Sequence, residues 1–147
     1  MNYLKVKKLR ENAIIPKRAT KGSAGIDLYA CLEAELTVPA RGHAFIPTGI
    51  AIALPDSSLV AMVFARSGLA IKHGIGLLNG VGVVDSDYRG EVCVGVCNQF
   101  DEEYTIQPGE RIAQIVIMPV SCLPVVETEN LEETERGEGG FGSTGQK

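Results

Sequence analysis

The run Glu91-Val-Cys-Val-Gly-Val-Cys97 decides the fold class of this 147-residue chain. It is short and rich in β-branched residues, and glycine and asparagine bound it, as is typical of a strand. Two runs of the same kind and four further expected strands occupy residues 58–64, 111–117, 3–8, 35–39, 44–53 and 123–126. Short strands between turn residues predict an all-β fold, a distorted jelly roll or β-sandwich. One short helix is expected over 67–72, with Ser67 as its N-cap.

The composition is that of one compact domain, 45% hydrophobic and long enough to bury a core. No apolar run reaches the length of a membrane span, and the N-terminal residues lack a secretory signal, so we expect a cytoplasmic protein with no membrane partner. The four cysteines include no CxxC pair, which favours buried free thiols over a zinc site. The net charge of −4 argues against a nucleic-acid partner. An anionic ligand would therefore need a local cluster of donors, helped by a divalent metal that it carries.

A change of composition near the C-terminus predicts three parts: a β domain over 1–126, an acidic linker over 127–135 and a glycine-rich arm over 136–147. If extended, the linker spans roughly 30 Å, enough to carry the arm to a distant site, even on another subunit. The bare backbone of the arm can wrap a polyanion, and Phe141 offers a face for stacking on a base. A disordered terminal tail is the alternative.

Two segments in the first half of the chain are candidates for anion or metal binding. Asp27 lies among apolar residues that indicate a buried strand, and it is either a turn-capping residue or part of a metal site or polar network. Arg66 and Ser67 lie at a strand-to-helix corner, where a side-chain cation and main-chain N–H groups suit an anion. A surface arginine beside a helix cap is the alternative.

Two later segments carry further candidates. In the segment 79–90, Asn79-Gly80 predicts a hairpin, and the amide of Asn79 has the donor and acceptor needed to bind a pyrimidine edge. Asp85 is a candidate base and Tyr88 could pack against a sugar, although two hairpin turns around a buried tyrosine remain possible. In the segment 105–114, Arg111 and Gln114 would point to opposite faces of a regular strand, so that only one of them faces a given ligand.

Five stretches in this order, AGIDLYA, ARSGLA, NGVGVVDSDYRG, GERIAQ and RGEGGFGSTG, resemble the five motifs of the trimeric dUTPase family. The resemblance covers residues 23–145 and implies a jelly-roll subunit that forms a homotrimer with active sites at its interfaces. It implies hydrolysis of dUTP to dUMP and pyrophosphate with Mg²⁺ held on the triphosphate. The implied roles in the cell are to limit uracil in DNA and to supply dUMP for thymidylate synthesis. The family's arm crosses to a neighbouring subunit and covers the bound nucleotide.

The resemblance also implies a role for each matching residue. Asp85 is the general base that activates the attacking water, and Tyr88 lies against C2′ and excludes a ribose hydroxyl. Asp27 meets the metal, through water, or orders the network around it. The residues that bind uracil are Asn79 and nearby backbone, including Val83, Val84 and Cys93, with Phe141 and Gly142 closing over the base. The residues that hold the phosphates are Arg66, Ser67, Gly68, Gln114, Arg136, Ser143 and Thr144. Those expected to stabilise turns and interfaces are Asp87, Arg89 and Arg111.

One position departs from the common family pattern. Val81 stands before the second glycine of the third stretch, where proline or alanine is frequent, and we expect altered packing without loss of activity. Two other functions remain open: a dCTP deaminase, alone or bifunctional, and a non-catalytic nucleotide sensor. The complete arm and the Asn79, Asp85 and Tyr88 set favour hydrolysis over both.

Overall fold

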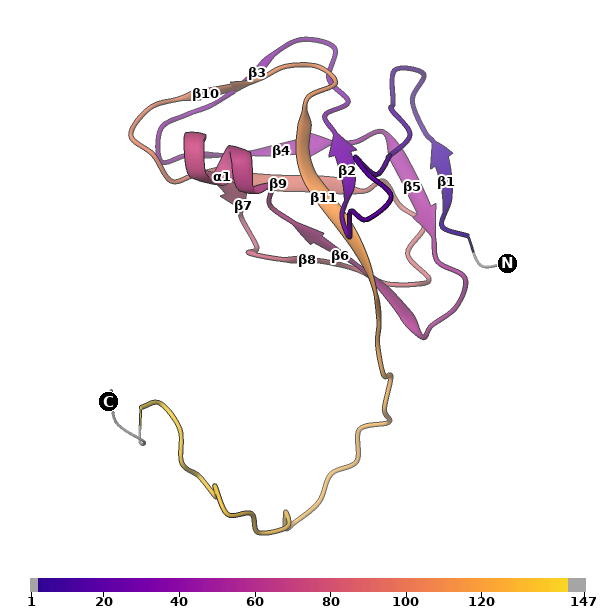
Figure 1. Ribbon diagram of the computed structural model, residues 1–147, viewed down its shortest axis with the longest axis vertical. Helices are drawn as coiled ribbons and strands as arrows, with labels where there is room; N and C mark the ends of the chain where they lie inside the picture. Colours follow the sequence, from indigo (N-terminus) through magenta and orange to yellow (C-terminus); the bar gives the residue numbers. More distant parts are fainter. Residues whose placement is uncertain (1–2, 143–147) are drawn as a thin grey trace.

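The computed structural model describes residues 3–142, which form strands and one short helix (Figure 1). The elements are β1 (Lys5–Lys8), β2 (Ile26–Tyr29), β3 (Leu36–Val38), β4 (His43–Pro47), β5 (Ile50–Ala53), β6 (Leu59–Phe64), α1 (Ser67–His73), β7 (Ile75–Leu77), β8 (Gly82–Val84), β9 (Cys93–Asn98), β10 (Tyr104–Ile106) and β11 (Arg111–Pro119). The predicted all-β class with one short helix is confirmed.

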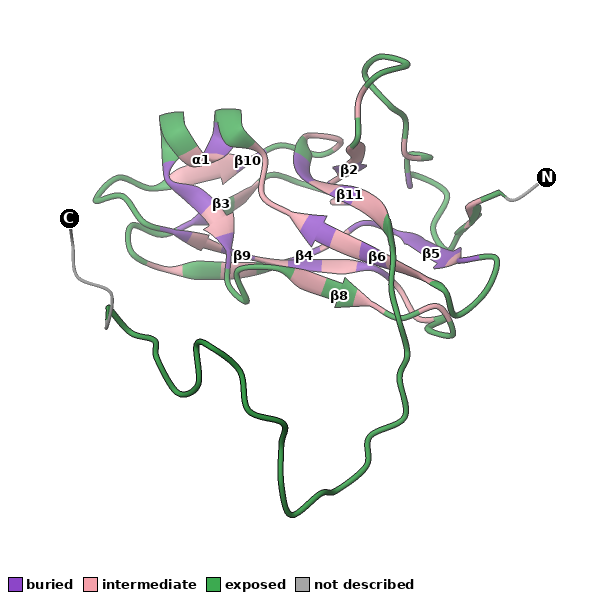
Figure 2. Cartoon of the chain, turned by 60° about the horizontal axis from the view of Figure 1, so that its bottom comes forward, coloured by how far each residue is buried: buried purple, intermediate pink, exposed green. Residues whose placement is uncertain are grey.

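Two antiparallel sheets share one hydrophobic core. The larger sheet has the order β2-β11-β6-β8 and the other β4-β9-β7, while β1 pairs with β5 and β10 with β3. Leu28 and Ile115 from the larger sheet and Ile46 and Val96 from the other belong to the same buried cluster. Figure 2 shows the buried residues along the strands between these layers. Alternate residues of β9 are buried, so one face of this strand packs against the core.

The strand expected over 44–53 is two strands. The chain turns at Thr48 and Gly49, so that β4 joins the sheet with β9 and β5 pairs with β1. Gly49 has a φ of 69°, a left-handed conformation that interrupts the extended chain. The turn also lies deep in the fold, since Thr48 is only 1% exposed.

The turn predicted at Asn79-Gly80 forms, but the hairpin prediction is wrong. Gly80 donates its main-chain N–H to the carbonyl of Leu77 at 3.0 Å, which closes the turn. The flanking strands do not pair with each other: β7 pairs with β9, and β8 pairs with β6 in the other sheet. The segment therefore crosses from one sheet to the other, and the space between the sheets at this crossing is open to a ligand.

Ser67 is not the helix cap. The residue with extended dihedral angles before α1 is Arg66, with φ −93° and ψ 130°, and no side chain caps the helix. The Arg66 side chain turns to Asp27, which is distant in the sequence.

The last predicted strand, 123–126, is also wrong. β11 ends at Pro119, and the following residues run away from the domain without regular structure (Figure 1). Leu123, Val125 and Val126 are exposed there, and no strand of the described chain lies beside them. Among residues 3–142, no helix is long and apolar enough to cross a membrane.

Candidate active site

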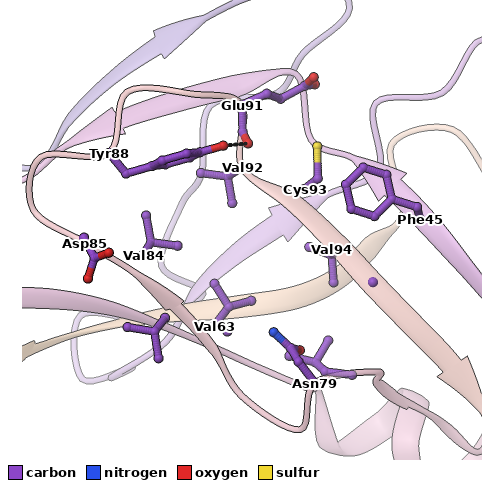
Figure 3. Close-up of a pocket in the computed structure, with 14 residues that line it drawn as sticks. Phe45, Val63, Asn79, Val84, Asp85, Tyr88, Glu91, Val92, Cys93 and Val94 are labelled. Carbon is purple, nitrogen blue, oxygen red and sulfur yellow. Dashed lines mark hydrogen bonds between the residues drawn. The ribbon is translucent and has the colours of Figure 1, made fainter.

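The crossing between the sheets forms one wall of a cavity of about 440 Å³, which we call the first cavity. Figure 3 shows its side chains arranged around an open space, with Asp85 and Asn79 on opposite sides. Six of the predicted site residues line it, namely Asn79, Val83, Val84, Asp85, Tyr88 and Cys93. An amide, a carboxylate and a phenol thus face one space with apolar walls, as in small-molecule sites generally.

Asp85 and Tyr88 are the ends of one closed turn. The Tyr88 N–H donates to the Asp85 carbonyl at 3.2 Å. Arg89 braces the same turn through Nη1, which donates to the carbonyls of Ser86 at 2.7 Å and Tyr88 at 2.9 Å. The predicted role of Arg89 in stabilising this turn therefore has direct support. Tyr88 is 45% exposed, so the alternative of a buried tyrosine is wrong.

Cys93 adds an uncharged wall to the first cavity. Burial raises the pKa of its thiol, and the negative charge of Glu91 acts in the same direction against a weaker opposite effect of Arg10. The thiol is therefore neutral at pH 7 and lacks the thiolate character of a nucleophile. This side chain contributes shape to the cavity.

A second cavity, of about 360 Å³, lies at the corner between β6 and α1. Its lining includes all five residues that were predicted to meet phosphates or metal outside the arm: Asp27, Arg66, Ser67, Gly68 and Gln114. Ser67 and Gly68 are exposed at the start of the helix, so their N–H groups are accessible to an anion.

Asp27 is the centre of an ion network at the second cavity. Its Oδ1 faces Arg66 Nε at 3.2 Å and its Oδ2 accepts from Arg111 Nη1 at 3.2 Å. Arg66 also donates through Nη1 to the Arg111 carbonyl at 3.0 Å. The Asp27 side chain is 14% exposed, so this pairing occurs in a partly desolvated place where it is stronger than on an open surface. Of the two alternatives for Asp27, the structure shows the polar network and not a turn cap.

Gln114 and Arg111 are positioned differently from a regular strand. The pairing of β11 with β2 shifts between Arg111 and Ala113, which indicates a bulge. Gln114 lines the second cavity and donates through Nε2 to the Ala65 carbonyl at 3.0 Å. Arg111 does not line the cavity and holds Asp27, in agreement with the structural role expected for it.

The two cavities share no lining residue. Within the chain, the predicted nucleoside residues and the predicted phosphate residues therefore form two separate surfaces. Arg136, Phe141 and Gly142 of the arm are exposed and belong to neither cavity. Ser143 and Thr144 lie outside the described residues.

Comparison with known proteins identifies the family. A family model described as dUTPase matches residues 11–145. The chain belongs to the dUTPase family. It is 51% identical to the deoxyuridine 5'-triphosphate nucleotidohydrolase of Desulfitobacterium hafniense over 99% of both chains. It is also 51% identical to the protein of that name from Oryza sativa subsp. japonica, over 97% of this chain and 80% of the plant protein.

Solved structures support the same conclusion. The dUTPase of Staphylococcus bacteriophage 80alpha with dUPNHPP has a TM-score of 0.87 to this chain at 28% identity, and the match covers 99% of each. A mutant dUTPase from phage phi11 of S. aureus, described with a structural Mg(II) ion, has a TM-score of 0.78 at 23% identity and supports the fold alone.

Eight of the fourteen residues that line the first cavity were not predicted as site residues, and two of them, Phe45 and Glu91, shape it with large side chains. Phe45 is 71% exposed on β4 and forms one wall of the cavity. The sequence shows only an aromatic residue within a strand. Such a residue can be assigned to a cavity only when the neighbouring strand is known. Glu91 follows the third motif directly, and it lines the cavity beside Tyr88.

Proposed function

We propose that this chain hydrolyses dUTP with Asp85 as the general base, which takes a proton from the water that attacks the α-phosphorus. Family membership assigns the reaction to dUMP and pyrophosphate, and the residue roles are our proposal. One observation supports them most: the first cavity brings Asn79, Asp85 and Tyr88 around a single space of nucleoside size. A carboxylate within hydrogen-bond reach of a water can act as such a base.

The first cavity is proposed to select the nucleoside. The Asn79 amide and adjacent main chain pair with the edge of uracil, and the narrow apolar walls leave no room for the methyl group of thymine. Tyr88 lies against C2′ and clashes with a ribose hydroxyl. A clash of this kind discriminates more strongly than the loss of one attractive contact.

The second cavity is proposed to hold the triphosphate. Arg66 supplies a guanidinium, while Ser67, Gly68 and Gln114 add neutral donors. Such donors stabilise the charge that builds up on the departing pyrophosphate, where most of the rate acceleration in phosphoryl-type transfer arises. The arm, through Arg136, Phe141, Gly142, Ser143 and Thr144, is proposed to close over the terminal phosphates and the base.

The donor set suits a Mg²⁺ ion that arrives with the nucleotide. Residues 3–142 contain no group of three or more histidine, cysteine, aspartate or glutamate side chains that could hold a metal ion. Mg²⁺ commonly keeps several waters and binds through substrate phosphates with few carboxylates. Asp27, whose two oxygens face arginines, would meet it through water. Bound there, the ion would neutralise charge on the phosphate oxygens.

The separation of the two cavities supports a site shared between subunits. A nucleotide has its base and its phosphates joined by one sugar, so one molecule would contact both surfaces if they face each other across a subunit interface. We therefore propose a homotrimer, with the first cavity of one subunit facing the second cavity of another. The cytoplasmic location and the roles in uracil exclusion and thymidylate supply stay predictions.

One assay tests this function against its two rivals. The purified protein is incubated with Mg²⁺ and dUTP, dCTP, dTTP or UTP, while pyrophosphate, ammonia and nucleotide products are followed. We expect pyrophosphate and dUMP from dUTP alone. Ammonia from dCTP would indicate a deaminase, and binding of dUTP without turnover would indicate a sensor.

A further inference from the structure

Glu91 lies outside the five dUTPase motifs, yet it connects Tyr88 to the core of the domain. The Tyr88 hydroxyl donates to the main-chain carbonyl of Glu91 at 3.0 Å (Figure 3). The Glu91 carboxylate reaches in another direction. Its Oε1 accepts the main-chain N–H of Gly49 at 2.8 Å, and its Oε2 pairs with Arg10 Nη2 at 3.1 Å.

The turn that holds this carboxylate is fixed. Gly49 has a φ of 69°, and a Cβ there would lie 2.6 Å from Cys31 Sγ and 2.7 Å from Ala13 Cβ, so the main chain approaches its neighbours as closely as possible. Next to it, the buried Thr48 donates its hydroxyl to the Val92 carbonyl. The Glu91 carbonyl, which accepts from the Tyr88 hydroxyl, is therefore held in two ways: through the neighbouring residue Val92 and through the Glu91 side chain.

Tyr88 itself has little packing to hold it. Its side of the cavity is open, as its 45% exposure shows. The ring lies directly over Gly90, where a Cβ would come within 2.6 Å of Tyr88 Cζ. A ring in contact with main chain on one face and solvent or ligand on the other can swing about its side-chain bonds unless its hydroxyl is anchored.

We propose that Glu91 is a positioning residue for sugar discrimination. Through Gly49 and Arg10 its side chain fixes the carbonyl that anchors the Tyr88 hydroxyl, and so holds the ring where a 2′-hydroxyl would lie. This inference rests on the proposed role of Tyr88 as the sugar gate. A side chain that excludes a ribonucleotide by steric clash must be rigid. If the ring can move aside, the ribonucleotide binds with little loss of free energy.

The test is the ratio of kcat/KM for dUTP to kcat/KM for UTP. This ratio does not depend on the fraction of folded enzyme, so a loss of stability does not affect it. We expect Glu91→Ala to lower the ratio by about tenfold, as for loss of a charge-assisted hydrogen bond. Glu91→Gln keeps an acceptor for Gly49 and should stay within about twofold of wild type, since only the ion pair with Arg10 is lost. Glu33→Ala is the matched control, because this exposed carboxylate accepts from Asn12 Nδ2 and should leave the ratio unchanged.

A double-mutant cycle tests the route through the hydroxyl. Tyr88→Phe removes the donor, so adding Glu91→Ala to it should change the ratio no further. An additive effect would overturn the inference, as would an unchanged ratio in Glu91→Ala. Tyr88→Ala separates the role of Tyr88 from the role of Glu91. If Tyr88→Ala alters the ratio while Glu91→Ala does not, Tyr88 excludes the ribose hydroxyl but Glu91 does not position it. If Tyr88→Ala leaves the ratio unchanged, the gate itself is wrong.

Discussion

Mixed trimers should recover activity that neither parent has. Asp85 lines the first cavity and Arg66 the second, and these cavities share no residue. Asp85→Asn removes the proposed base, and Arg66→Gln removes the proposed phosphate cation. Losses of about 10² or more are usual for either kind of group, so each variant alone should be almost inactive.

The size of the recovery follows from the geometry of a three-membered ring. A competent site needs the first cavity of an Arg66→Gln subunit facing the second cavity of an Asp85→Asn subunit. In a ring with two subunits of one kind and one of the other, about one of three interfaces meets this requirement, whichever kind is in excess. Purified mixed trimers should therefore show about one third of the wild-type kcat, with an unchanged KM for dUTP.

The two variants are co-expressed with different affinity tags, mixed trimers are isolated by two successive columns, and pyrophosphate release is measured. Trimers of two differently tagged wild-type chains are the control and should keep full activity. Mixed trimers as inactive as their parents would show that both residues act within one chain or that Arg66 does not contact the substrate. Either outcome removes the shared site as we describe it.

Three other predictions concern the base, the arm and a half-buried tyrosine. Asp85→Asn should bind a non-hydrolysable dUTP analogue with near wild-type affinity in calorimetry while kcat falls by about 10² or more; substantial retained turnover would exclude Asp85 as the base. A chain that ends before Arg136 should keep its oligomeric mass and melting temperature but lose most activity, so wild-type rates would leave the arm without a catalytic role. Burial, with donation of its hydroxyl to Glu110, raises the pKa of Tyr104 to about 12. The unfolded phenol ionises near pH 10, so the stability from Tyr104 is complete below that pH and lost as the pH rises toward 12. The free energy of unfolding, measured by urea titration, should decline less between pH 10 and 12 in Tyr104→Phe than in the wild type. An identical decline would show that ionisation of Tyr104 is not linked to stability.

Local sequence rules predicted most of the strands but not β7, β8 or β10, and they predicted strand partners poorly. The β-branched content of 91–97 and 58–64 and the turn residues that bound them belong to each segment alone, so these strands can be read from a single segment. The turn at Asn79-Gly80 was also correctly placed. Whether its flanking strands pair with each other depends on β9 and β6, which compete for them, and no local pattern contains that information.

The same limit explains the errors at the candidate site. Ser67 satisfies the local rule for a helix cap, but Arg66 occupies the capping position and its side chain pairs with the distant Asp27. Motifs gave the residues that we propose to touch the ligand, because the order of these motifs is characteristic of the family. They did not give Phe45 or Glu91, whose importance comes only from what lies beside them after folding.

The ion network at the second cavity accounts for a carboxylate beside the proposed phosphate site. Asp27 would compete with a triphosphate for Arg66 if the guanidinium could bind only one of them. Arg66 can bind both, because its two recorded contacts use Nε towards Asp27 and Nη1 towards the Arg111 carbonyl. A guanidinium has five N–H donors, so others stay available for a phosphate. Asp27 therefore holds Arg66 in one orientation with donors still available, which lowers the ordering cost when phosphate binds. Arg111 offsets the remaining repulsion, because it neutralises the second carboxylate oxygen without entering the cavity.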